Sequence, residues 1–240
     1  MKTPLLKIEH DATALFRQRP NRFLGVVDII GPKPEQDVDV HIHDPGRLND
    51  ILLPGARLLL RSAKNPARKT KWDLIAGFCN DHWVLVHSGY HRAITEVILN
   101  NDQISPFGVV KKIAAEVTYR HSRLDFLLTQ FDDSKIWIEV KGCTLAENGV
   151  ASFPDAPTTR GRKHLETLIE LRESGERAAV IFLVFRQDAN IFAPNADIDP
   201  LFTKSFHKAV NAGVEIYPLQ FSFNGNRVHY LRNLPLFNLQ

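Results

Sequence analysis

Short apolar segments alternate with turn signals through the first 90 residues. Each segment has the length and β-branched or aromatic content of a strand, and clusters rich in Gly, Pro, Asn and Asp separate it from the next. The five predicted strands are 22–30, 37–44, 56–63, 72–79 and 82–89. With one helical turn near 46–53, this pattern predicts a small five-stranded barrel of the OB type. An open five-stranded sheet is the alternative.

The hydrophobic pattern changes after residue 90, where helical spacing first appears. The predicted elements are a helix at 91–101, strands at 112–120, 122–131 and 135–143, a helix at 158–176, a strand at 178–185, a helix at 199–213 and a strand at 214–221. The segment 178–185, AAVIFLVF, is apolar throughout and predicts a central strand covered on both faces. This order predicts a mixed α/β sheet with helices on its faces. The chain therefore divides into 1–88 and 89–240.

The strand KIWIEVKGC at 135–143 carries charges where an apolar strand should have none. Because side chains alternate between faces, Trp137, Glu139 and Lys141 share one face, and the intervening apolar residues share the other. Asp125 stands among apolar neighbours in the preceding strand, 122–131. If the two strands are adjacent, both carboxylates reach one place, with the Lys141 ammonium beside them.

Two buried carboxylates need compensation, because an unpaired buried charge is costly. A Glu–Lys ion pair on an edge strand is the simpler explanation of Glu139 and Lys141. A hard-cation site for Mg²⁺ or Mn²⁺ is the functional explanation, with Asp125 and Glu139 as ligands. The second carboxylate and Gly142, which ends the strand where a cation or phosphate could approach, favour this explanation. Such a site supports phosphodiester hydrolysis, with Lys141 orienting water or phosphate.

Basic residues are concentrated in one predicted loop. The net charge is only +3, and the excess of Lys and Arg over Asp and Glu falls within the first 90 residues. The segment 57–72 holds six basic residues and no acidic one: Arg57, Arg61, Lys64, Arg68, Lys69 and Lys71. It is either a solvated loop or a phosphate-binding surface.

A second group of basic residues opens the helix at 158–176. Arg160, Arg162 and Lys163 lie where free backbone N–H groups attract anions, so phosphate contact and ordinary surface charge are both explanations. Asp155 is a further candidate carboxylate, although a turn role is the simpler one. His164 is within reach of the predicted cation site, although a packing role is the simpler one.

Three weaker signals lie in the first 90 residues. His41 and His43, with Asp44, have a spacing that suggests zinc, but no second His or Cys pair has a matching spacing. Trp72 and Trp83 are candidates to stack on bases, and core packing is the alternative. Arg47, in the turn that follows His43, is a further candidate for DNA contact.

Two cysteines, Cys79 and Cys143, do not form a disulfide framework, which favours a reducing compartment. The N-terminal segment has no apolar stretch long enough for a signal peptide, and no run approaches the roughly 20 residues of a membrane span. We therefore expect a soluble cytoplasmic protein without a membrane partner.

The motif SRLDF followed by WIEVKGCTL resembles the D…E-x-K core of the PD-(D/E)xK nuclease superfamily. More narrowly, the chain resembles the sugar fermentation stimulation protein (SfsA) family. The segments that carry this resemblance include HDPGRLNDILLPGARLLL, RKTKWDL, HRAITEVILN and IEVKGCTLAENGVASFPDAPTTRGRKHLETL. The resemblance implies an N-terminal OB-fold, a C-terminal nuclease-like domain and binding to single- or double-stranded DNA with little sequence preference.

Carried onto this sequence, the resemblance gives Asp125, Glu139 and Lys141 as catalytic residues, with Asp125 and Glu139 holding Mg²⁺ or Mn²⁺. The superfamily often adds a glutamate from the preceding helix, which implies Glu96 as a further ligand. Glu116 is the alternative, and each of these glutamates has a structural explanation as well. The superfamily's usual Pro before the first acid is replaced here by Leu124.

Two rival functions stay open at this point. One is a DNA-binding regulator of sugar (maltose-type) metabolism whose nuclease-like centre is idle. The other is an enzyme acting on single strands or RNA, because OB-folds accept either kind of strand.

Overall fold

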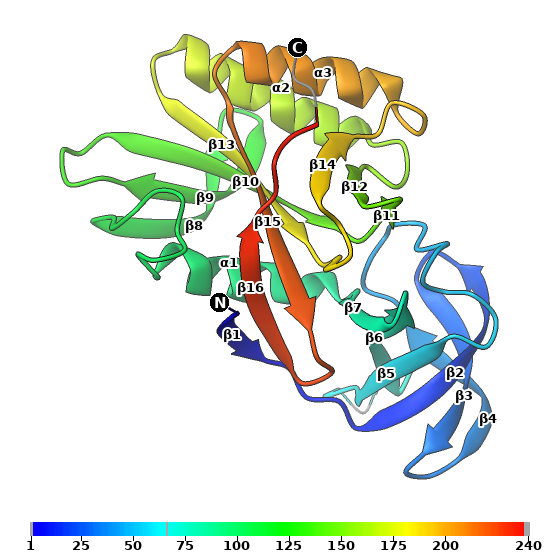
Figure 1. The fold of residues 1–240 in the computed structure, drawn as a ribbon. Coiled ribbons are helices and arrows are strands. Elements are labelled where there is room, and N and C mark those ends of the chain that lie inside the picture. Colours follow the sequence, from blue (N-terminus) through cyan, green and yellow to red (C-terminus); the bar gives the residue numbers. More distant parts are fainter. Residues whose placement is uncertain (1, 66, 238–240) are drawn as a thin grey trace.

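The computed structural model describes residues 2–65 and 67–237, which form a barrel, a mixed sheet, a small separate sheet and three α-helices (Figure 1). The barrel strands are β2 (Ala12–Asn21), β3 (Leu24–Gly31), β4 (Glu35–His41), β5 (Arg57–Ser62) and β6 (Trp72–Cys79). They are hydrogen-bonded in the order β4-β3-β2-β5-β6, and β4 pairs in parallel with β6 through Val40–Trp72 and His41–Asp73. The last pairing closes the ring, so the predicted OB barrel is confirmed and the open sheet is wrong.

One of the five strands that form the ring is not the one predicted. β2 was not predicted, because its second half, RQRPN, is polar and includes a proline. The segment predicted at 82–89 gives β7 (His82–Leu85), which lies outside the ring. β7 pairs with β6 and, through Trp83–Phe223, with β15 (Glu215–Phe223), so it carries the sheet from the barrel into the second half of the chain. The predicted helical turn is a single turn, in which Leu52 N donates to Leu48 O.

The second half is a mixed sheet, as predicted. Its strands are β8 (Lys112–Tyr119), β9 (Ser122–Thr129), β10 (Lys135–Cys143), β13 (Arg177–Val184), β15 and β16 (Arg227–Asn233). β8, β9 and β10 are antiparallel, β10, β13 and β15 are parallel, and β16 returns antiparallel to β15. A separate small sheet contains β11 (Ala146–Glu147), β12 (Val150–Phe153) and β14 (Ile191–Pro194).

Helices cover both faces of this mixed sheet. α1 (His91–Leu99) lies on one face, and α2 (Thr159–Glu173) and α3 (Pro200–Asn211) lie together on the other (Figure 1). The central strand β13 shows why its sequence is apolar throughout. Ile181 and Leu183 join the core under α1, and Val180 and Phe182 join the core under α2 and α3. The prediction of a strand buried on both faces is confirmed.

The N-terminal segment joins the far sheet rather than the barrel. β1 (Thr3–Lys7) pairs antiparallel with β16, although the sequence places all of 1–88 in the first domain. Within 2–65 and 67–237, no helix is both long and apolar enough to cross a membrane.

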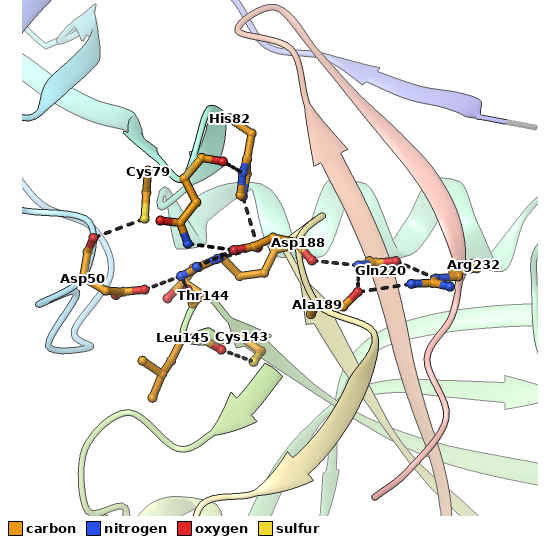
Figure 2. Close-up of polar contacts among 12 residues, drawn as sticks. Asp50, Cys79, His82, Cys143, Thr144, Leu145, Asp188, Ala189, Gln220 and Arg232 are labelled. Carbon is orange, nitrogen blue, oxygen red and sulfur yellow. Dashed lines mark hydrogen bonds and ion pairs between the residues drawn. The ribbon is translucent and has the colours of Figure 1, made fainter. Parts of the chain in front are cut away.

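A buried arginine fixes the barrel against the second sheet. Arg186, just after β13, is fully buried and forms ion pairs with Asp50 of the barrel and with Asp188, at 2.8 Å for the latter. It also donates to Thr144 O at 3.1 Å, and its own carbonyl accepts from Gln220 Nε2 at 2.8 Å. Figure 2 shows Asp50, Asp188 and Gln220 converging on this place from separate segments. Burial alone would lower the pKa of Arg186, but the two carboxylates outweigh burial and raise it.

Substituting Arg186 is expected to destabilise the fold strongly. Arg186→Met leaves Asp50 and Asp188 without their cation, and breaking a buried charge pair typically lowers the free energy of unfolding by about 3–5 kcal/mol. Arg120→Ala is the matched control, because the Arg120–Glu170 ion pair is exposed and should contribute less than about 1 kcal/mol. Urea unfolding of both variants measures the difference. Equal losses of unfolding free energy in the two variants would contradict the role of Arg186 in holding the barrel against the second sheet.

Candidate active site

The site begins where β9 and β10 separate. Their backbone pairing runs from Lys135–Thr129 to Ile138–Phe126. Beyond that pair, Asp125 Oδ2 accepts a hydrogen bond from Val140 N at 2.7 Å. A carboxylate therefore takes the place of a backbone carbonyl, and this holds Asp125 beside the β10 residues on either side of Val140.

Glu139 is the most enclosed charge of the site. Its side chain is only 3% exposed, and Oε1 accepts hydrogen bonds from Lys141 Nζ and His164 Nδ1, the latter from α2. Oε2 is buried and has no hydrogen-bond partner. Burial would raise the pKa of Glu139, but the hydrogen bond from His164 and the Lys141 charge outweigh it and lower the pKa. Glu139 is thus an ionised carboxylate with one oxygen free.

The pKa of Asp125 shifts in the opposite direction from that of Glu139. Burial, followed by repulsion from Glu139, raises its pKa, although the hydrogen bond from Val140 N works against this rise. Both carboxylates line one cavity with Lys141. A buried carboxylate oxygen without a partner, next to a second carboxylate, is the donor set that a hard divalent cation satisfies. The residues present therefore fit Mg²⁺ or Mn²⁺.

The structure separates the two candidates for a further ligand. Glu116 lines the same cavity, whereas Glu96 lies outside it and pairs with Arg92 at 2.9 Å. Glu116 has a φ of 55° and, unlike its neighbours Ala115 and Val117, has no ladder partner in β9, although the β8–β9 register is the same on both sides of it. It is also paired with Arg92 at 3.2 Å and with Arg123 at 3.4 Å.

The cavity has a volume of about 570 Å³ and lies between the barrel and the mixed sheet. The barrel contributes Arg22 and the loop 44–46, the turn after β7 contributes Ser88, and the mixed-sheet side contributes the loop 153–158. The two loops meet at Asp155, whose Oδ2 accepts from Arg47 N at 2.7 Å. The Asp155 carboxylate packs so closely on Gly46 that an added Cβ would lie 2.2 Å from it. Asp155 thus closes the cavity wall, in accord with a structural role.

Gly142 has a neighbour that the sequence did not predict. The sequence suggested that a cation or phosphate approaches this residue, but an added Cβ would lie 2.2 Å from Cε1 of His91. The His91 ring also stacks on Phe185, with centroids 5.6 Å apart. Burial lowers the pKa of His91 to about 4, so its ring is neutral at pH 7. A neutral ring therefore forms this part of the cavity lining.

The predicted basic residues at the start of α2 divide into three different environments. Arg160 lines the cavity. Arg162 turns away to pair with Asp199 at 3.4 Å, and Lys163 is exposed. Thr158 caps the helix by accepting from Gly161 N at 3.0 Å.

The basic loop of the barrel does not line this cavity. Arg57 stacks over Phe78, Arg61 donates to the Tyr90 hydroxyl at 2.6 Å, and Arg68 pairs with Asp73 at 2.8 Å. The lysines Lys64, Lys69 and Lys71 are exposed. The three arginines of the predicted surface are therefore engaged in intramolecular contacts. Trp72 and Trp83, the predicted stacking residues, are partly buried and pack against the core.

The suggested zinc set does not converge. Asp44 lines the cavity, whereas His43 Nε2 contacts Asp73 Oδ1 at 2.9 Å and the His43 ring stacks on His87 at 3.7 Å. His43, Asp73 and His87 offer ligand atoms within 4.8 Å of one another. However, Asp73 is already paired with Arg68, and nearly parallel stacked rings direct their lone pairs side by side rather than to one point.

Asp44 is a site residue that sequence reasoning assigned only to zinc. Burial raises its pKa from 3.8 to about 6, although the hydrogen bond from Gly46 N opposes the rise. Because the folded pKa lies above the unfolded one, the unfolded chain loses its proton first. Stability therefore falls as pH rises from about 4 to about 6 and stays lower above that range.

Asp44→Asn should remove this pH dependence while keeping the acceptor for Gly46 N. We expect no difference in melting temperature below pH 4 and a more stable variant above pH 6, by up to about 3 kcal/mol. Thermal unfolding from pH 3.5 to 7.5 in EDTA measures the difference, with the exposed Asp39→Asn as control. A difference that is constant across this range would contradict the assignment.

The fold and the site define a class: an OB barrel joined to a mixed α/β domain, with a carboxylate-lined cavity between them. Family models agree with both halves. Residues 18–86 match the SfsA N-terminal OB domain, and 89–227 match the sugar fermentation stimulation protein RE domain. The chain belongs to the sugar fermentation stimulation protein (SfsA) family, as the sequence motifs predicted.

Individual relatives match over nearly the whole chain. A sugar fermentation stimulation protein homolog of Methanococcoides burtonii is 47% identical, covering 97% of this chain and 94% of its own length. The homolog of Thermosipho melanesiensis is 41% identical, with 97% of both chains covered. The solved structure of Pyrococcus furiosus SfsA in complex with Ca²⁺ is 26% identical, with a TM-score of 0.88 over 98% of this chain and all of the other.

Proposed function

We propose that this protein is a divalent-cation-dependent phosphodiesterase that binds DNA with little sequence preference. The observation that carries the proposal is the buried, unpartnered Oε2 of Glu139 beside Asp125 and Lys141 in one cavity. A similar protein from Pyrococcus furiosus is described in complex with Ca²⁺, which supports a cation-binding role for this family.

Each side chain has a role that follows from its contacts. Asp125 and Glu139 would hold the cation, which when bound polarises a phosphoryl group and lowers the pKa of water. His164 positions Glu139 by donating to Oε1, and Oε2 has no hydrogen-bond partner. Lys141 is held beside Glu139 and 3.3 Å from His164 Nδ1, where its ammonium can donate to a phosphate oxygen.

Arg160 and Arg22 supply charge for the phosphate backbone on opposite sides of the same cavity. Contacts to phosphates position a nucleic acid without reading its sequence, which accounts for weak sequence preference. The exposed lysines of the barrel loop extend this electrostatic surface outside the cavity.

Substitutions at the centre should abolish cleavage and leave binding in place. We expect Asp125→Asn, Glu139→Gln and Lys141→Ala each to lower Mg²⁺-dependent cleavage of labelled DNA by at least about 100-fold, because each removes a cation ligand or the phosphate donor. Glu170→Gln, an exposed helix position, is the control. Cleavage is followed on gels with Mg²⁺, Mn²⁺ or EDTA, and binding by fluorescence anisotropy.

The regulator alternative gives a different result in the same experiment. It requires that the wild-type protein cleave neither DNA nor RNA with either cation, and that binding be unchanged by EDTA.

The barrel lysines should contribute to binding through salt-dependent phosphate contacts. Lys64→Ala combined with Lys69→Ala should reduce the slope of log K against log salt by about 1.8, because each phosphate contact on duplex DNA contributes about 0.9. The control is Lys112→Ala with Lys135→Ala, two exposed lysines of the mixed sheet. Salt titrations by fluorescence anisotropy measure the slopes. An unchanged slope in the first variant would remove this loop from the interface.

A further inference from the structure

The candidate reaction centre lies in a cavity of limited size. Glu139 is 3% exposed and lines this cavity of about 570 Å³. Volumes of this order enclose one small molecule, comparable to a nucleotide. A phosphodiester in the middle of an intact duplex would have to bring both strands and their stacked bases into the same space.

The barrel wall of the cavity is built as a fixed structure. The Arg19 guanidinium donates to the carbonyl oxygens of Arg22 at 2.7 Å, Asp44 at 3.3 Å and Arg47. One side chain thus ties together both barrel segments that line the cavity. The Asp155 contact to Arg47 N, together with its close packing on Gly46, joins this wall to the opposite loop. Opening the wall for a duplex would break all of these contacts.

An exposed aromatic ring lies next to the cavity wall. Phe23 follows the cavity residue Arg22 and is 50% exposed, and its ring is nearly parallel to that of His41, with centroids 6.5 Å apart. An exposed aromatic face binds an unpaired base by stacking, whereas the bases of a duplex are already stacked on one another. Arg22 and Phe23 together offer a phosphate contact and a base contact to the same strand.

We propose that the DNA strand enters this cavity unpaired, as a single strand, an overhang or a flap, and that Phe23 stacks on one of its bases. The inference rests on the proposed phosphodiesterase function for cleavage, but its binding component does not.

The test compares oligonucleotides of one sequence as a single strand, a blunt duplex and a duplex with an unpaired flap. Binding is measured by fluorescence anisotropy with Ca²⁺, and cleavage positions are mapped with Mg²⁺. We expect binding to the single strand and the flap to be at least tenfold tighter than to the blunt duplex, with cuts in unpaired DNA. Phe23→Ala should weaken single-strand binding by about tenfold and leave duplex binding unchanged. Phe131→Ala, which removes a 69% exposed ring elsewhere, is the matched control.

Three outcomes overturn the inference: equal affinity for single strand and blunt duplex, internal cutting of a blunt duplex as fast as of a single strand, or an equal effect of Phe23→Ala on both. Absence of cleavage on every substrate would instead contradict the proposed phosphodiesterase function, and the affinities measured with Ca²⁺ would still test the unpaired strand.

Discussion

The structure depends on a carboxylate placed inside a sheet. Glu139 lies in β10 among apolar residues, and its charge is retained because Lys141 and His164 donate to one of its oxygens. The other oxygen has no partner, a rare and unfavourable state for a buried polar atom. The separation of β9 from β10 brings Asp125 to the same place and adds a second negative charge. These features leave a buried carboxylate oxygen without a partner beside a second carboxylate.

Holding this cavity requires the barrel to keep a fixed position. On one side, the barrel is held by the sheet that continues through β7 and by the buried Arg186. On the other side, it is held by the contact between Arg47 and Asp155. The barrel therefore acts as a wall of the site. This fixed contact between the barrel and the mixed sheet explains why Arg22 and Asp44 line the same cavity as Asp125, although they lie more than eighty residues before it in the chain.

The sequence predicted those parts that depend on local periodicity. Strand alternation placed Glu139 and Lys141 on one face, and the neighbouring strand supplied Asp125, all three of which line the cavity. The sequence did not predict the site residues that only long-range contacts bring together. Asp44 and Asp155 carry no periodic signal, because they are loop residues that meet only in the folded chain. The choice between Glu96 and Glu116 depended on which of them lines the cavity, and alternation along a strand does not reveal this.

The energetics of the cavity bear on the choice between an active and an idle centre. Asp125 and Asp44 both have raised pKa values, so these two carboxylates oppose folding at neutral pH, whereas the lowered pKa of Glu139 favours it. Replacing buried charges by apolar side chains of similar size is often neutral or stabilising. A chain that only needed to bind DNA through its exposed lysines would gain stability by such replacements. Under the proposed function, a bound cation would offset the repulsion between Asp125 and Glu139 that the fold alone leaves in place, and this would account for the two carboxylates.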